Sequence, residues 1–201
     1  MVGAVKSSDT RWHEGAVTAQ DRAAALGFTG ATVWLTGLPA SGKSTLAVEV
    51  EALLIGAGRP ALRLDGDNLR HGLNGDLGFS ADDRAENVRR TAEVAALLAD
   101  AGVVVLVALV SPYRADRAAA RAVHERLELP FLEVHVATSL EECERRDPKG
   151  LYARARAGEL THLTGVDDPY EPPQSPEVTV TGDEPLEAAA ERLLAALRTA
   201  R

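Results

Sequence analysis

The sequence predicts an α/β fold of three layers, in which a mostly parallel central sheet lies between two layers of helices. Short apolar runs typical of buried strands alternate with longer segments whose apolar residues recur at helical spacing. The most apolar run, residues 103–110, is rich in valine and contains no polar residue. Such a run is typical of a strand buried on both faces of a parallel sheet.

The predicted elements follow one another in a regular order. Strands are expected at residues 31–36, 60–64, 103–110, 131–136 and 177–180, and helices at 43–55, 80–102, 114–127, 139–147 and 185–198. Two helix starts carry capping signals, because Ser80 and Ser139 each precede a carboxylate by three residues. Residues 147–176 contain five prolines and are predicted to be an irregular, mobile segment outside the regular core.

Length and composition narrow the classes of protein. The 201 residues suffice for one domain, predicted at 31–201 after an N-terminal extension of residues 1–30. The net charge of −8 argues against nucleic-acid binding through a basic face, and Cys143, the single cysteine, excludes a disulfide framework. The N-terminus lacks the apolar core of a signal peptide, and the apolar runs are shorter than the roughly 18 residues of a membrane helix. A cytoplasmic protein with no membrane contact is expected.

A phosphate-binding loop follows the first predicted strand. Residues 37–44 match the pattern G-x-x-x-x-G-K-[ST] and open a helix. In such a loop the glycines let backbone N–H groups surround phosphates, the lysine reaches the β- and γ-phosphates, and the serine binds Mg²⁺. ATP and Mg²⁺ are therefore the expected cofactors. The residues predicted to bind the nucleotide are Gly37, Leu38, Pro39, Ala40, Ser41, Gly42, Lys43, Ser44 and Thr45.

Carboxylates at the second strand favour a small-molecule kinase with the three-layer P-loop kinase fold. Motor ATPases and GTPases usually place an aspartate at the end of a buried strand, but the strand at 103–110 ends at Ser111. Asp65 and Asp67 instead end the second strand, at the edge of the sheet where such folds bind ligands. A carboxylate at this edge suits a base or a metal ligand.

Several cationic residues and one aromatic residue lie in the segments predicted to bind the second substrate. They are Arg70, Phe79, Arg84, Arg89, Arg90, Arg114 and Lys149. Arginine forks suit bidentate contact with phosphate or sulfate oxygens. For a single arginine, however, a solvated helix face is the more common role, and Arg89, Arg117 and Arg121 are predicted to lie on such faces.

Several further blocks resemble the adenylyl-sulfate kinase (APS kinase) family, whose members make the activated sulfate donor PAPS. The blocks, in chain order, are residues 37–45, 64–73, 76–80, 83–84, 86–90, 111–114, 146–152 and 164–171. The likeness extends from about Trp12, in Trp12-His13-Glu14, to the last helix. The P-loop alone is generic, whereas the other blocks in this order are specific.

The resemblance implies roles for particular residues. Asp67 would act at the 3′-hydroxyl of the acceptor ribose, as a base or through Mg²⁺ held with Ser44, and Arg146 would lie near the adenine of ATP. Residues from about 147 to 171 would close as a lid. The substrate, adenosine 5′-phosphosulfate, would be bound by Asp65, Asp67, Arg70, Phe79, Arg84, Asn87, Val110, Ser111, Lys149, Gly150 and Leu151.

One departure concerns the lid. The family usually has an aromatic residue before Thr164-Gly165, and this chain has Leu163. Loss of a second stacking face would weaken substrate binding without abolishing activity, since stacking contributes about 1–3 kcal/mol per base in single-stranded nucleic-acid sites.

Alternatives remain at the level of mechanism and of function. Ser111 is sometimes assigned in this family as a phosphoserine intermediate. Direct in-line transfer needs no covalent intermediate and is favoured. The resemblance also implies a homodimer and association with ATP sulfurylase. Two other functions stay open: a P-loop kinase for another acceptor, such as a sugar acid or nucleoside, and a non-catalytic nucleotide-binding subunit. The intact Lys43 and Asp67 argue against the second.

Overall fold

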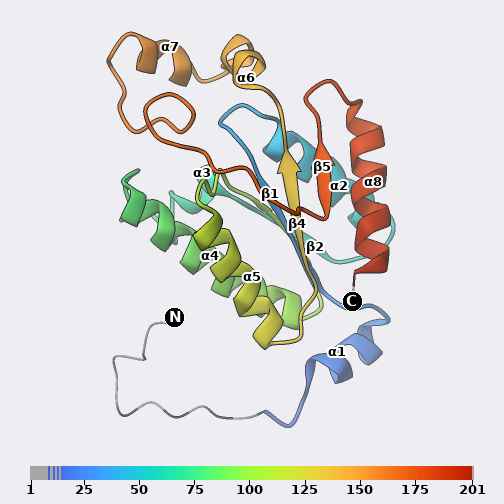
Figure 1. The fold of residues 1–201 in the computed structure, drawn as a ribbon. Helices are drawn as coiled ribbons and strands as arrows, with labels where there is room; N and C mark the ends of the chain where they lie inside the picture. Colours follow the sequence, from blue (N-terminus) through green and yellow to red (C-terminus); the bar gives the residue numbers. More distant parts are fainter. Residues whose placement is uncertain (1–8, 10, 12, 14, 201) are drawn as a thin grey trace.

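The computed structural model describes residues 9, 11, 13 and 15–200, and its core is a sheet of five parallel strands (Figure 1). The strand order is β2-β3-β1-β4-β5. The strands are β1 (Ala31–Thr36), β2 (Ala61–Asp65), β3 (Val104–Ala108), β4 (Phe131–Val136) and β5 (Val178–Val180). The predicted α/β fold with a parallel sheet is confirmed, and each predicted strand is present to within two residues at either end.

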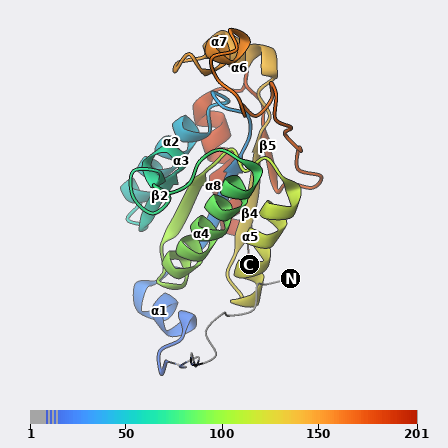
Figure 2. The same ribbon diagram turned by 90° about the vertical axis from the view of Figure 1, so that its left-hand side faces the viewer.

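Helices cover both faces of the sheet. The helices are α1 (Ala19–Leu26), α2 (Lys43–Gly56), α3 (Gly66–Leu69), α4 (Ala81–Asp100), α5 (Arg114–Arg126), α6 (Leu140–Arg146), α7 (Leu151–Arg156) and α8 (Leu186–Thr199). One face packs on α2 and α8 and the other on α4 and α5, so two apolar cores flank the sheet. The α6–α7 region lies beyond the carboxyl ends of the strands, at the opposite end of the molecule from α1 (Figure 2).

The central strand explains where the site lies. All six residues of β1 are buried; Val33 and Leu35 face the core under α2 and α8, whereas Trp34 faces the core under α4 and α5. Because β1 lies between β3 and β4, its carboxyl end delivers the phosphate loop to the middle of the sheet edge. This edge is where open α/β sheets bind their ligands.

The N-terminal extension contains a helix, α1, that is not among the predicted elements. Thr18 and Asp21 form a capping box at the start of α1, and Gly27 ends the helix in a left-handed conformation. The Arg22 guanidinium pairs with the Asp100 carboxylate at the end of α4. The capping box was the sequence signal that could have revealed this helix. Trp12 and Glu14, which form part of the family resemblance, lie outside the described residues.

The predicted irregular segment is more structured than expected. It contains helix α7, and Tyr152 and Leu163 pack with Cys143 of α6 in a third small apolar cluster. The prediction of an irregular segment is therefore wrong for Leu151–Arg156, whose apolar side chains at helical spacing find partners on α6 and the P-loop. Within the described part of the chain, no helix combines the length and apolar character that crossing a membrane requires.

Candidate active site

The phosphate loop is closed around its own lysine. Gly42 begins α2 with φ of 105°, and a Cβ on Gly37 would lie 2.5 Å from the Val136 carbonyl oxygen, so both positions require glycine. The Lys43 ammonium donates to the carbonyl oxygens of Gly37 (3.0 Å) and Leu38 (2.7 Å). Burial lowers the pKa of Lys43 to about 8. A buried ammonium beside the N-terminus of α2 is well suited to receive phosphate oxygens.

A hydroxyl and a carboxylate meet at the corner between the loop and β2. Ser44 Oγ donates to Asp65 Oδ2 at 2.6 Å, and the other carboxylate oxygen of Asp65 accepts from the Asp67 backbone at 3.0 Å. Hydroxyl and carboxylate oxygens are the ligands that Mg²⁺ prefers, so these residues fit the ion. The family resemblance implies that Ser44 and Asp67 hold the ion, whereas the structure brings Asp65 to Ser44.

Asp67 lies at the mouth of the site. Its side chain is 67% exposed and forms an ion pair with Lys149, which belongs to the predicted lid. Asp67 also lines a cavity of about 90 Å³ between α3, α4 and the end of β3. The carboxylate therefore stands where the phosphate loop, the cavity and the lid meet.

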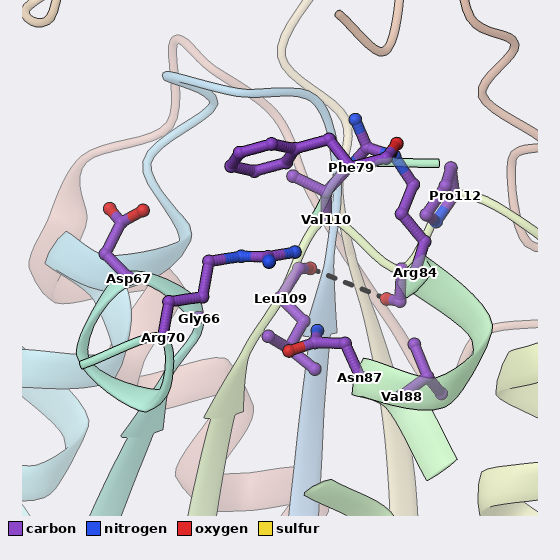
Figure 3. Close-up of a pocket in the computed structure, with 11 residues that line it drawn as sticks. Gly66, Asp67, Arg70, Phe79, Arg84, Asn87, Val88, Leu109, Val110 and Pro112 are labelled. Carbon is purple, nitrogen blue, oxygen red and sulfur yellow. Dashed lines mark hydrogen bonds between the residues drawn. The ribbon is translucent and has the colours of Figure 1, made fainter. Parts of the chain in front are cut away.

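Most of the residues predicted to bind the phosphoryl acceptor line this cavity, which we call the acceptor cavity (Figure 3). Its walls are Gly66, Asp67, Arg70, Phe79, Arg84, Asn87, Val88, Leu109, Val110, Ser111 and Pro112. The Phe79 ring lies 4.2 Å from the Arg70 guanidinium carbon and is 55% exposed, so this aromatic side chain is not part of the core. An exposed aromatic face next to arginine forks can hold a base and an anionic group together.

Arg84 and Asn87 are buried on the first turns of α4. Arg84 donates through Nε to the Phe79 carbonyl (3.0 Å) and through Nη2 to the carbonyl of His162 in the lid (2.6 Å). Asn87 Oδ1 accepts from Asn74 Nδ2 at 2.8 Å. Arg84 thus joins the cavity directly to the lid.

A second cavity of about 190 Å³ lies on the other side of the phosphate loop, between α2, α6 and the start of α8. Arg146, which the family resemblance assigns to the surroundings of the ATP adenine, lines this cavity and donates to the Gly182 carbonyl at 2.7 Å. Thr181 and Gly182 also line this cavity but were not predicted. Their position directly after the last strand was the available signal, because ligands bind at the carboxyl ends of such strands.

Other predicted residues lie in different surroundings. Leu163 is 6% exposed and packs in the small cluster with Cys143 and Tyr152, outside the walls of the acceptor cavity. Gly150 and Leu151 begin α7 and are likewise not among those walls.

The three arginines predicted to be solvated differ in their exposure. Arg89 is exposed, with 59% of its side chain accessible, and Arg121 is partly buried. Arg117 is only 2% exposed, so the prediction of a solvated side chain is wrong for this residue. Its burial depends on a carboxylate from β4, which the local sequence does not reveal.

Comparison with known proteins decides the family. The family model described as adenylylsulphate kinase matches residues 29–181. The chain belongs to the adenylylsulphate kinase family. It is 52% identical over 196 residues to the adenylyl-sulfate kinase of Citrobacter koseri, covering 97% of this chain and 96% of that protein.

Two further relatives come from Mycobacterium tuberculosis. The bifunctional enzyme CysN/CysC is 53% identical over 188 residues, which is 94% of this chain, although the chain spans only 30% of that enzyme's length. The solved structure of the APS kinase CysC in complex with AMPPNP and APS superimposes with a TM-score of 0.83 at 54% identity. That match covers 85% of this chain and 99% of the solved one.

Proposed function

We propose that this protein transfers the γ-phosphoryl group of Mg·ATP to the 3′-hydroxyl of adenosine 5′-phosphosulfate, giving PAPS and ADP. The observation that carries the proposal is the acceptor cavity, where Phe79, Arg70 and Arg84 share a wall with Asp67. An aromatic face and two arginine forks suit an adenine with a phosphosulfate. The relative solved with AMPPNP and APS supports the assignment.

Transfer of this kind depends on positioning and charge stabilisation. Lys43 would move from the carbonyl oxygens of its own loop to the β- and γ-phosphate oxygens. Asp67 would orient the acceptor hydroxyl and take up its proton, with Lys149 holding the carboxylate from the lid side. Ser44 and Asp65 would hold Mg²⁺, which when bound supplies positive charge beside the phosphates.

Direct transfer is proposed rather than a phosphoserine at Ser111. This residue is 3% exposed, and its hydroxyl accepts a hydrogen bond from Trp34 Nε1 at 3.1 Å. Its hydroxyl also points toward the Leu109 carbonyl, at 3.5 Å. A buried hydroxyl held between two neighbours serves as part of the cavity wall more readily than as a nucleophile that must be reached by ATP.

The test is ADP release with ATP and Mg²⁺ in the presence of adenosine 5′-phosphosulfate, gluconate, a nucleoside or no acceptor. Release with adenosine 5′-phosphosulfate alone, with PAPS identified by mass, is the expected result. Release with another acceptor would contradict the substrate assignment but support the assignment as a P-loop kinase. ATP binding without release on any acceptor would favour the non-catalytic subunit.

The cellular setting is also part of the proposal. We expect a cytoplasmic homodimer in which residues 147–171 close over the two nucleotides and residues 1–30 form an extension to the single kinase domain. Association with ATP sulfurylase, which would supply the substrate, is proposed as well. Sedimentation of the purified protein, alone and mixed with ATP sulfurylase, measures both associations.

A further inference from the structure

Arg117 is a buried charge beside the acceptor cavity with no role in the function proposed above. It lies on the first turn of α5, and its guanidinium donates to three separate segments of the chain. Nε donates to Glu133 Oε1 of β4 at 2.6 Å, Nη1 to the Ser111 carbonyl at 2.7 Å and Nη2 to the Glu171 carbonyl at 2.7 Å. Glu133 compensates the buried charge. The two carbonyl contacts need a separate explanation.

The first carbonyl belongs to a strained turn. Ser111 has a φ of 39°, a left-handed conformation that residues with a Cβ rarely adopt. Such backbone persists only where neighbouring groups hold it. The Ser111 carbonyl accepts from Arg117 and, at 3.3 Å, from Thr36 Oγ1. Because Ser111 lines the acceptor cavity, Arg117 holds the shape of that wall from behind.

The second carbonyl belongs to the end of the lid. The Glu171 backbone N–H donates to the Pro112 carbonyl at 2.9 Å, next to the strained turn. The neighbouring Tyr170 ring lies 5.9 Å from the Arg117 guanidinium, and its hydroxyl is 3.1 Å from Thr36 Oγ1. Thr36 directly precedes the phosphate loop. Arg117 therefore joins the lid end, the cavity wall and the strand that carries the loop.

We propose that Arg117 is a positioning residue that couples the lid to the shape of the acceptor cavity through the Ser111 turn. It lines neither of the two cavities and acts through the two carbonyls that it holds. The kinetic part of this inference rests on the proposed function, whereas the coupling of lid to turn does not.

The test replaces the forked guanidinium of Arg117 with the ammonium of lysine, which keeps the positive charge. In Arg117→Lys the ammonium can still pair with Glu133, but a point charge cannot serve three diverging acceptors. KM for adenosine 5′-phosphosulfate should rise about tenfold, as expected for loss of a charge-assisted hydrogen bond. KM for ATP should stay within about twofold, because the phosphate loop keeps its own contacts. Trypsin should cut the lid faster at Arg154 and Arg156, both exposed in α7.

Arg121→Lys is the matched control. Arg121 lies one turn further along α5 and also donates to a carboxylate and a carbonyl, those of Glu177 (2.8 Å) and Phe131 (3.3 Å). Neither Glu177 nor Phe131 lines the acceptor cavity. The control should leave both KM values and the rate of lid cleavage at wild-type levels, even where it lowers the melting temperature.

Each outcome has a defined reading. Equal rises in both KM values, or lid cleavage no faster than in the control, would overturn the proposal. If the wild-type protein shows no turnover with adenosine 5′-phosphosulfate, the proposed function fails and lid cleavage alone decides the coupling. If Arg117→Lys does not fold, Glu133→Gln weakens the ion pair that holds the Arg117 guanidinium against the two carbonyls. Faster lid cleavage in that variant would support the coupling, and an unchanged rate would refute it.

Discussion

The buried Lys43 predicts that Lys43→Met makes the protein inactive and more stable. A pKa lowered from 10.5 to about 8 by burial means that keeping the ammonium charged in the fold is unfavourable by roughly 3 kcal/mol. The methionine leaves the carbonyl oxygens of Gly37 and Leu38 without their donor, which costs about 1–2 kcal/mol. The expected net gain at pH 7 is therefore about 1–2 kcal/mol in the free energy of unfolding.

The pH dependence gives the sharper test. Below pH 8 Lys43 is protonated in both the folded and the unfolded chain, so the full penalty of the buried charge applies. Between pH 8 and 10.5 the unfolded chain binds more protons than the folded one, so wild-type stability gains from rising pH. The advantage of Lys43→Met should shrink across this range and then reverse.

Urea denaturation from pH 7 to pH 10, on the wild type and the variant without nucleotide, measures the difference directly. Lys149→Met is the control, because that lysine is 58% exposed and should show no comparable stabilisation. ADP release should be lost in Lys43→Met at every pH. A variant less stable than the wild type at pH 7, or a difference that stays constant to pH 10, would refute the burial argument.

Three further substitutions test separate parts of the site. Phe79→Ala should raise KM for adenosine 5′-phosphosulfate about tenfold, in line with a stacking contribution of about 1–3 kcal/mol, with little loss of stability because the ring is 55% exposed; an unchanged KM would remove the ring from the substrate site. Asp67→Asn should lower kcat about 100-fold or more while ATP binding by calorimetry is kept; near-normal turnover would exclude a catalytic role. Leu163→Phe should lower the free energy of unfolding by about 1–3 kcal/mol through overpacking and leave KM unimproved; tighter substrate binding would show that this side chain reaches the base.

The fold could be predicted from the sequence because its signals are local. The valine-rich run at residues 103–110 and the capping pair of Ser80 and Asp83 each identify an element without reference to the rest of the chain. Helix α7 escaped prediction because the prolines around it favoured an irregular segment. Its stability depends on packing of Tyr152 against Cys143, which is a tertiary contact.

The site was predictable where residue type and function coincide. Lys43 belongs to a pattern whose chemistry requires a lysine, whereas Arg84 was predicted from a block of the family resemblance and lies in the wall of the acceptor cavity. Arg117 was missed because an arginine on a charged helix is usually solvated, and its partner Glu133 lies on a strand 16 residues away. Likewise, two aspartates at one strand end do not reveal which one meets Ser44; the turn at α3 directs Asp65 inward.

Backbone strain shows how the separate loops of the site depend on one another. Ala40, Ser111 and His162 have φ values of 60°, 39° and 63°, and they belong to the phosphate loop, the cavity wall and the lid. Such residues cost about 1–3 kcal/mol each and persist where neighbours hold them. Arg117 holds the Ser111 carbonyl, and Arg84 holds that of His162. Each of these two strained loops is thus fixed by a buried arginine from a helix on the same face of the sheet. The two helices therefore set the geometry of loops that the loop sequences alone would not adopt.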